Sequence, residues 1–265
     1  ARQTIQRGVG LMPTFSANLG FLWTQHALAD GIRAAHRHGF HAVECHFPYD
    51  EPITDVCQAL EDTGLPMLGL NTIRGPLNAG LAALPDQIAE ARVAIDQACH
   101  YGQQIGALNV HVMAGKIDGE LAQKTYLDNL RYASDCASKH TMNVLIEPLN
   151  PSDMPGYFLR DTGHACELLE TLNRSNVKLM FDCYHVGQTE GSVIERFQQC
   201  LPVIGHVQFA SVPDRGPPGD GVVDYHQVFQ AIDASGWTMP LGAEYKVSGQ
   251  TEETLNWLSH FSQKG

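Results

Sequence analysis

One stretch of the chain, residues 177–209, decides the fold class: VKLMFDCYHVGQTEGSVIERFQQCLPVIGHVQF. It begins with an apolar run at 177–182, continues through a segment of helical period at 189–200, and ends in a second apolar run at 204–209. Short apolar runs on both sides of a helix are typical of two parallel strands joined by a crossover helix. The stretch therefore predicts one complete β-α-β unit.

The same alternation extends in both directions along the chain. Apolar runs predict eight strands, at residues 15–19, 42–46, 67–70, 108–113, 144–147, 177–182, 204–209 and 241–244. The segments that follow them predict eight helices, at residues 24–38, 53–63, 85–105, 120–140, 161–173, 189–200, 224–235 and 250–262. Asp161 and Thr162 are typical of a helix start, and Gly236 of a helix end. Eight such units in series predict a single (β/α)8 TIM barrel.

Length and composition agree with one barrel. The chain has 265 residues, close to the roughly 250 of a typical TIM barrel. Its 43% of hydrophobic residues is enough for a sizeable core. An open, doubly wound sheet is the alternative architecture, but no GxGxxG motif follows the first strand.

Charge and cysteine content limit the partners of the protein. The chain has 17 basic and 29 acidic side chains, a net charge of -12, which repels nucleic acid and anionic membrane surfaces. It has no run of 18 apolar residues, and its seven cysteines form no CxxC pair. We therefore expect a cytoplasmic protein with reduced thiols and neither a nucleic-acid nor a membrane partner. The sequence is compatible with a homo-oligomer.

Oxygen-bearing side chains end four successive strands. Glu147, Asp182, Gln208 and Glu244 end the fifth to eighth strands, whose carboxyl ends form an arc around the mouth of a closed barrel. Each acid alone could instead pair with a lysine or cap the next helix. Three neighbouring carboxylates, however, repel one another unless a cation lies among them. The sequence therefore predicts one divalent ion, Mg²⁺ or Mn²⁺ in preference to Zn²⁺, because every ligand is an oxygen donor.

Basic side chains follow the same strand ends. His185 lies three residues after Asp182, Arg215 follows the seventh strand, and Lys116 and Lys246 follow the fourth and eighth. Together they predict a site that neutralises a substrate carboxylate and polarises its carbonyl. A lone loop lysine is more often simply solvated. We therefore expect Arg215 to bind the carboxylate, with Lys116 or Lys246 as the alternative.

Other polar residues give weaker signals. Glu44 and His46 share one side of the second strand, where they either support a ligand or form a buried pair. The histidines at 36, 38 and 41 have no acidic or cysteine partner at metal-binding spacing. The chain contains no Gly-x-Ser-x-Gly elbow, which disfavours nucleophilic hydrolysis.

Taken together, these segments resemble the hydroxypyruvate isomerase family of xylose-isomerase-like TIM barrels, which includes the 2-oxo-tetronate isomerases. The matching stretches are FSANL (15–19), GFHAVE (39–44), FPYD (47–50), NAG (78–80), HVMAG (111–115), NLRYA (129–133), IEPLN (146–150), DCYH (182–185), PDR (213–215) and EYK (244–246). Their order is preserved from residue 12 to the C-terminus. Residues 12–265 are thus expected to form the barrel, and residues 1–11 an N-terminal extension or an expression remnant.

The resemblance implies an activity and a role for each site residue. It implies that Glu147, Asp182, Gln208 and Glu244 bind the metal and that Glu147 and Glu244 also transfer protons. His185 and Arg215 would contact the substrate. The implied reaction is aldose-ketose isomerisation of a small anionic sugar acid, of the hydroxypyruvate or 2-oxo-tetronate type, through an enediolate.

Two other functions fit the same residues. A metal-dependent decarboxylase or epimerase of a 3-oxo sugar acid or ketose would keep the same four ligands, because its reaction also passes through an enediolate. A non-catalytic sugar-acid binding protein would keep the barrel alone. The presence of both Glu147 and Glu244 argues against the binding protein, since binding needs no second proton-transfer carboxylate.

Overall fold

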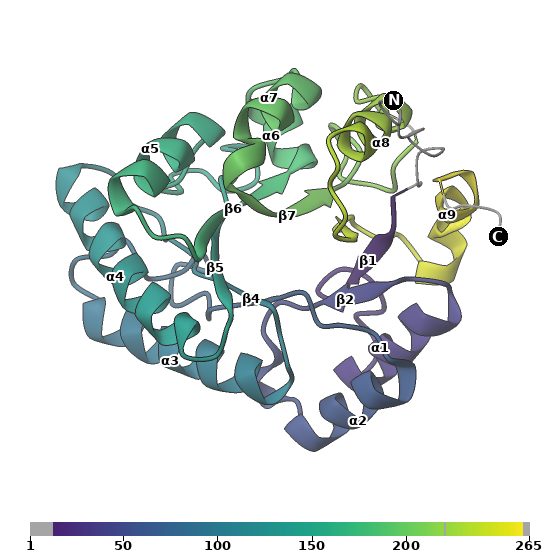
Figure 1. Cartoon of the computed structure of the whole chain (residues 1–265), viewed down its shortest axis with the longest axis horizontal. Helices are drawn as coiled ribbons and strands as arrows, with labels where there is room; N and C mark the ends of the chain where they lie inside the picture. The colour runs from purple at the N-terminus through teal and green to yellow at the C-terminus, as the bar shows by residue number, and fades with distance from the viewer. Residues whose placement is uncertain (1–12, 220, 262–265) are drawn as a thin grey trace, which may run out of the picture.

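The computed structural model describes residues 13–219 and 221–261, and these form one (β/α)8 barrel (Figure 1). Eight parallel strands make a single sheet in the order β2-β1-β8-β7-β6-β5-β4-β3. They are β1 (Phe15–Asn18), β2 (Ala42–Glu44), β3 (Leu70–Asn71), β4 (Asn109–His111), β5 (Asn143–Ile146), β6 (Val177–Asp182), β7 (Ile204–Phe209) and β8 (Leu241–Ala243). Every predicted strand is present. The expectation for residues 1–11 lies outside the described part of the chain.

Backbone hydrogen bonds between the segments of β2 and β3 close the barrel. Val43 and Met67 form a parallel bridge. The Val43 N–H donates to the Pro66 carbonyl at 3.0 Å, the Leu68 N–H to the Val43 carbonyl at 2.7 Å, and the Cys45 N–H to the Gly69 carbonyl at 3.0 Å. The alternative of an open, doubly wound sheet is therefore wrong, and the carboxyl ends of all eight strands surround one mouth.

Helices form a ring around the sheet (Figure 1). They are α1 (Leu28–Arg37), α2 (Ile53–Thr63), α3 (Ile88–Gln104), α4 (Glu120–Ser138), α5 (Thr162–Leu172), α6 (Cys183–Thr189), α7 (Val193–Cys200), α8 (Tyr225–Ala234) and α9 (Asn256–Phe261), with short 3-10 turns at Pro48–Asp50, Leu201–Val203 and Thr251–Thr254. Within the described residues, no helix is long and apolar enough to cross a membrane. All seven cysteines are free thiols.

The helix predicted at residues 189–200 is shorter and forms α7 at Val193–Cys200, and a helix that was not predicted, α6 at Cys183–Thr189, precedes it. The chain turns helical immediately after β6, because the Asp182 carboxylate accepts a hydrogen bond from the Tyr184 N–H at 2.8 Å and so caps α6. The break between α6 and α7 comes at Gly191 and Ser192, which both have the positive φ of the left-handed region. This correction matters for the site, because α6 carries His185 to the barrel mouth.

The predicted start of α5 and the predicted end of α8 are confirmed, and the helix predicted at 250–262 is shorter. Asp161 caps α5 by accepting from the His164 N–H at 2.8 Å, and Gly236 follows α8 with a φ of 82°. The segment predicted as one helix at 250–262 begins instead as the 3-10 turn Thr251–Thr254, which a capping box at Gln250 and Glu253 fixes before α9 starts.

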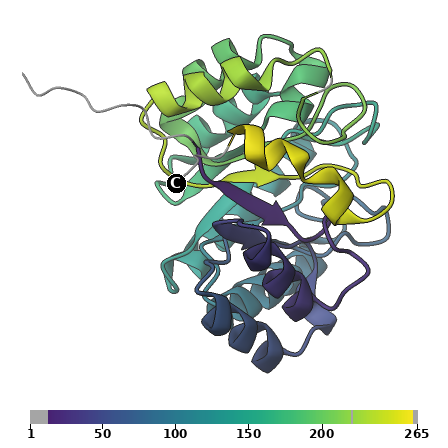
Figure 2. The same ribbon diagram turned by 90° about the vertical axis from the view of Figure 1, so that its right-hand side faces the viewer.

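An aromatic cluster fastens the last helices to the barrel. The ring of Phe15 on β1 lies 5.7 Å from Phe209 on β7, 5.4 Å from Phe229 on α8 and 5.0 Å from Trp257 on α9, all edge-to-face. All four side chains are buried. Figure 2 shows α9, in yellow, lying alongside β1. The cluster therefore joins the first and last units of the chain.

We predict that Phe15→Ala lowers the free energy of unfolding by about 3 to 5 kcal/mol, because it leaves a cavity among three rings. Chemical denaturation followed by circular dichroism measures this loss. Val93→Ala on α3 is the control, since Val93 is 69% exposed and should change stability by no more than about 0.5 kcal/mol. A loss of similar size in both variants would contradict the proposed role of the cluster.

Candidate active site

Four side chains from the last four strands meet at the mouth of the barrel. Glu147 follows β5, Asp182 ends β6, Gln208 lies near the end of β7, and Glu244 follows β8. The register aligns them, because Asp182 pairs with Gln208 and Gln208 pairs with Gly242. One ligand atom from each of Glu147, Asp182, Glu244 and the nearby His185 lies within 4.8 Å of the others. Gln208 Nε2 is 3.3 Å from Glu244 Oε1.

The cluster leaves acceptor oxygens without partners. Glu147 Oε1, Asp182 Oδ2 and Gln208 Oε1 are buried and have no hydrogen-bond partner among the described residues. A buried polar atom left unpaired costs about 1 to 3 kcal/mol, so three at one place indicate that something else satisfies them. Carboxylate and amide oxygens are the donors that hard divalent cations prefer. The residues present therefore fit the metal expected from the sequence.

Burial and mutual repulsion raise the pKa values of Glu147 and Asp182. Burial raises the pKa of Glu147 well above its usual value, and the charges of Glu244 and Asp182 raise it further. Burial and Glu244 raise the pKa of Asp182 to about 7. A cation among these groups would act in the opposite direction and favour the ionised carboxylates.

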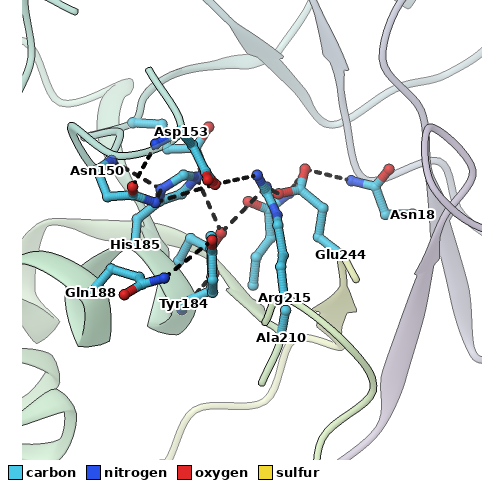
Figure 3. A network of polar contacts seen from close by, with 12 residues as sticks. Asn18, Asn150, Asp153, Tyr184, His185, Gln188, Ala210, Arg215 and Glu244 are labelled. Carbon is cyan, nitrogen blue, oxygen red and sulfur yellow. Dashed lines mark hydrogen bonds and ion pairs between the residues drawn. The ribbon is translucent and has the colours of Figure 1, made fainter. Parts of the chain in front are cut away.

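Glu244 is the carboxylate with the most polar partners. Its Oε1 accepts from Asn18 Nδ2 at 2.9 Å, and its Oε2 accepts from Arg215 Nη2 at 2.6 Å (Figure 3). Oε1 also accepts from His46 Nε2 at 3.0 Å. Burial raises the pKa of Glu244, but the His46 hydrogen bond and the Arg215 charge outweigh burial and lower the pKa to about 2. Glu244 is therefore held ionised and in one orientation.

Arg215 lies between two carboxylates and two aromatic rings. Its Nη1 donates to Asp153 Oδ2 at 3.2 Å and its Nη2 to Glu244 (Figure 3). Its guanidinium carbon is 4.8 Å from the centres of both the Phe21 and Tyr184 rings. Burial alone would lower the pKa of Arg215, but the neighbouring carboxylates raise it. The guanidinium thus supplies a fixed positive charge to an acidic site.

His185 presents a donor to the cluster. Its Nδ1 accepts from the backbone N–H of Asn150 at 3.0 Å and lies 2.8 Å from Asn150 Nδ2. Burial, with a smaller effect of Arg215, lowers the pKa of His185 to about 3, so the ring is neutral and its proton is on Nε2. Nε2 lies 3.7 Å from Asp182 Oδ2 and 3.8 Å from Glu147 Oε1, without a hydrogen-bond partner among the described residues. This arrangement suits a donor to a substrate oxygen better than a metal ligand.

The two lysines named from the sequence are placed differently from Arg215. Lys116 is half-buried beside Tyr157, and the side chain of Lys246 is exposed. In the described part of the chain, no ion pair joins either lysine to the carboxylates. The backbone of Lys246 does reach the site, because its N–H donates to the Arg215 carbonyl at 2.7 Å and so anchors the loop that carries Arg215.

Glu44 and His46 do not pair with each other. His46 hydrogen bonds to Glu244, while Glu44 Oε2 accepts from Nε2 of His206 on β7. Burial opposes a charge on His206, but the Glu44 carboxylate outweighs burial and raises the pKa of His206. Glu44 Oε1 lies 3.5 Å from Gln208 Nε2. Glu44 thus holds the amide so that Gln208 Oε1 is left for the cluster.

Several of these partners were not identified from the sequence. His206 could have been identified from the sequence, because it lies two residues before Gln208 on the same face of a strand. Asn18 also ends a strand, β1, and Asn150 and Asp153 lie in the loop after β5. Loops at this end of a barrel carry the functional residues, but nothing local marks which of their polar side chains point inward.

Comparison with known proteins identifies the family of the chain. A family model described as xylose isomerase-like TIM barrel matches residues 32–261. Over 257 residues the chain is 37% identical to 2-oxo-tetronate isomerase of Cupriavidus necator, covering 94% of this chain and 99% of that protein. It is 32% identical to hydroxypyruvate isomerase of Escherichia coli, covering 94% of this chain and 100% of that protein.

A solved structure gives the same result for the fold. The crystal structure of a protein from Brucella melitensis, named AP endonuclease, family 2, superposes with a TM-score of 0.90 at 32% identity, covering 95% of this chain and all of that one. The protein is thus a xylose-isomerase-like TIM barrel. Within that class it belongs to the family of the hydroxypyruvate and 2-oxo-tetronate isomerases, and it is an enzyme of the isomerase type.

We predict that Gly242→Ala disrupts the cluster, because a Cβ at residue 242 would lie 2.2 Å from Glu44 Oε1 and 2.9 Å from Gln208 Cγ. Both side chains would have to move, so divalent-metal affinity measured by calorimetry should fall by about tenfold or more. Gly31→Ala on α1 is the matched control, because its Cβ would meet Leu19 at an ordinary 3.5 Å. Unchanged metal affinity in Gly242→Ala would show that Glu44 does not position Gln208.

Proposed function

We propose that this protein is a divalent-metal-dependent aldose-ketose isomerase of a small 2-oxo or hydroxy sugar acid, of the hydroxypyruvate or 2-oxo-tetronate type. The observation that carries the proposal is the set of unpartnered oxygens of Glu147, Asp182 and Gln208 beside Glu244. The isomerases to which the chain is similar support the substrate class.

The ion expected from the donor set is Mg²⁺ or Mn²⁺, with Zn²⁺ less favoured, because all four ligands are oxygens. Glu147, Asp182, Gln208 and Glu244 would hold it. A divalent cation bound there would offset the repulsion between the carboxylates and stabilise the negative charge of an enediolate.

Glu147 and Glu244 are placed for proton transfer. They directly follow β5 and β8, with β6 and β7 between these strands in the sheet, so a substrate bound in the arc has a carboxylate on each side. If Oε1 of Glu147 binds the ion, its second oxygen, Oε2, which lies 3.7 Å from His111 Nδ1, remains to accept a proton from the carbon next to the carbonyl. Glu244, held ionised, takes the proton of the substrate hydroxyl and gives it to the neighbouring carbon, and Glu147 releases its proton to the oxygen that was the carbonyl, so both carboxylates are regenerated.

Side chains around the two glutamates bind the substrate. His185 donates its Nε2 proton to a substrate oxygen, and Asn150 keeps the ring in the required tautomer. Arg215 adds a positive charge beside Glu244 and strengthens binding of an anionic substrate. Lys116 and Lys246 remain weaker proposals, since neither is paired with the cluster in the described residues.

Two experiments separate this reaction from the alternatives. An isomerase, like an epimerase that works through an enediolate, incorporates deuterium from D₂O into the substrate, whereas a binding protein does not. Product analysis then distinguishes isomerisation from epimerisation and from loss of carbon dioxide. A panel of hydroxypyruvate, 2-oxo-tetronates, 3-oxo acids and free ketoses, each assayed with Mn²⁺, covers the candidate substrates.

We predict that Mn²⁺ or Mg²⁺ raises the melting temperature of the protein. An ion that binds only the folded state at 100 times its dissociation constant adds about 2.7 kcal/mol of stability. Asp182→Asn should lose most of this gain in differential scanning calorimetry. Asp214→Asn, at an exposed aspartate in the loop after β7, should keep it. The metal site is refuted if the wild-type protein shows no shift with Mg²⁺, Mn²⁺ or Zn²⁺.

We predict that Glu147→Gln and Glu244→Gln each lower kcat by at least about 100-fold, the usual scale of general acid-base catalysis. Glutamine keeps an oxygen ligand but cannot accept the proton. Metal content must be measured with the kinetics, so that loss of the ion is recognised. Glu170→Gln on the exposed face of α5 is the control. A metal-loaded Glu244→Gln enzyme with near-normal turnover would rule out the two-glutamate mechanism.

A further inference from the structure

The substrate of the proposed reaction carries a carboxylate, and the mouth of the barrel is already acidic. Three carboxylates lie there, and the whole chain has a net charge of -12. To bind there, a substrate carboxylate therefore needs a positively charged side chain that is not already paired with a carboxylate of the protein. Arg215 is already paired, because both of its terminal nitrogens donate to carboxylates, one to Asp153 and one to Glu244.

Arg74, in the loop after β3, is a second arginine close to the site. Its guanidinium carbon lies 4.6 Å from the centre of the Phe47 ring, and its Nη1 donates to Asn78 Oδ1 at 3.3 Å. In the described part of the chain, Arg74 has no ion-pair partner. A guanidinium that stacks on a ring keeps its in-plane N–H groups free to bind a carboxylate.

The backbone holds Arg74 in place. The Arg74 carbonyl accepts hydrogen bonds from the N–H groups of Ala79 at 3.0 Å and Gly80 at 2.7 Å. Gly80, with a φ of 97°, packs so closely on Met113 that a Cβ there would lie 2.4 Å from the Met113 carbonyl oxygen. The loop is therefore fixed at its base against the segment that follows β4.

A cavity of about 350 Å³ lies beside Arg74. Arg74, Phe47 and His46 line it, and His46 Nε2 is 3.0 Å from Glu244 Oε1. The ring of His46 occupies the space above Gly20, where a Cβ would lie 2.1 Å from its Nδ1. Glu51 also lines the cavity but forms no ion pair with Arg74. The cavity thus places a guanidinium that has no ion-pair partner in the described residues next to His46, which hydrogen bonds to Glu244 of the cluster.

The electrostatics agree with this geometry. Burial lowers the pKa of Arg74, while the charge of Glu244 raises it and that of Arg215 lowers it. Arg74 therefore lies within electrostatic range of both groups at the centre of the site. An arginine remains protonated in proteins, so its charge is available to an entering anion.

We propose that Arg74 binds the carboxylate of the substrate in this cavity and so selects sugar acids over neutral ketoses. The proposal rests on the proposed function and gives Arg74 the carboxylate-binding role that the sequence assigned to Arg215. Arg215 remains with Glu244, next to the oxygens that react. Because the Arg74 side chain is exposed, solvent screens the contact, and its contribution to binding is moderate.

The test compares two pairs of compounds that differ only in the carboxylate. The metal-loaded enzyme is assayed with 2-oxo-tetronate and with the ketose erythrulose, and binding of erythronate and of the neutral polyol erythritol is measured by calorimetry. The variants are Arg74→Ala, Arg74→Lys and the control Arg174→Ala. Arg174 precedes β6 at the opposite end of the barrel and pairs with Asp135.

We predict that Arg74→Ala raises KM for 2-oxo-tetronate and Kd for erythronate by about tenfold, with kcat changed by less than about threefold. Arg74→Lys should recover part of the loss, and kcat/KM for erythrulose should stay within about twofold of wild type. Arg174→Ala should behave as wild type.

The two ways of failing are distinct. If the wild-type enzyme isomerises 2-oxo-tetronate while Arg74→Ala leaves KM and Kd unchanged, or changes both members of each pair equally, the role of Arg74 is wrong and the proposed function stands. If the wild-type enzyme isomerises no sugar acid but binds erythronate in a manner that depends on Arg74, the proposed reaction is wrong and the carboxylate site stands.

Discussion

Repulsion between three buried carboxylates is the constraint on which the site depends. Glu147, Asp182 and Glu244 lie at one end of the barrel, where burial makes each charge costly and the neighbouring charges make it more so. Ion pairs and hydrogen bonds to Arg215 and His46 offset this cost at Glu244. Glu147 and Asp182 keep unpartnered oxygens, and a divalent cation is the ligand that satisfies them best.

The barrel holds these groups together by its backbone. Parallel pairing from β5 to β8 fixes the four ligand positions side by side, and closure between the β2 and β3 segments brings Glu44 and His46 across to the same site. Asp182 pairs with Gln208, and Gln208 with Gly242, so backbone hydrogen bonds set the relative positions of these side chains. Gly242 contributes by leaving room for Glu44 and Gln208 inside the barrel.

Two arginines near the mouth of the barrel differ in their partners. Arg215 is enclosed by Asp153, Glu244 and two rings, so it belongs to the structure of the site as much as to substrate binding. Arg74 stacks on one ring and has no ion-pair partner in the described residues. A guanidinium already paired with carboxylates gains less from a new anion than a free one, because the anion must compete with the existing partners.

The sequence by itself determined the eight-stranded barrel and the four oxygen-bearing side chains at its mouth, because hydrophobic period and the residue that ends each strand are local properties. It missed the helix α6, whose start depends on the Asp182 cap, and it left open whether Glu44 and His46 support a ligand or pair with each other. Only the tertiary structure decided the true partners, Glu44 with His206 and His46 with Glu244, which are 162 and 198 residues apart in the chain. Such contacts form when the barrel closes, and no local pattern records which side chains then face one another.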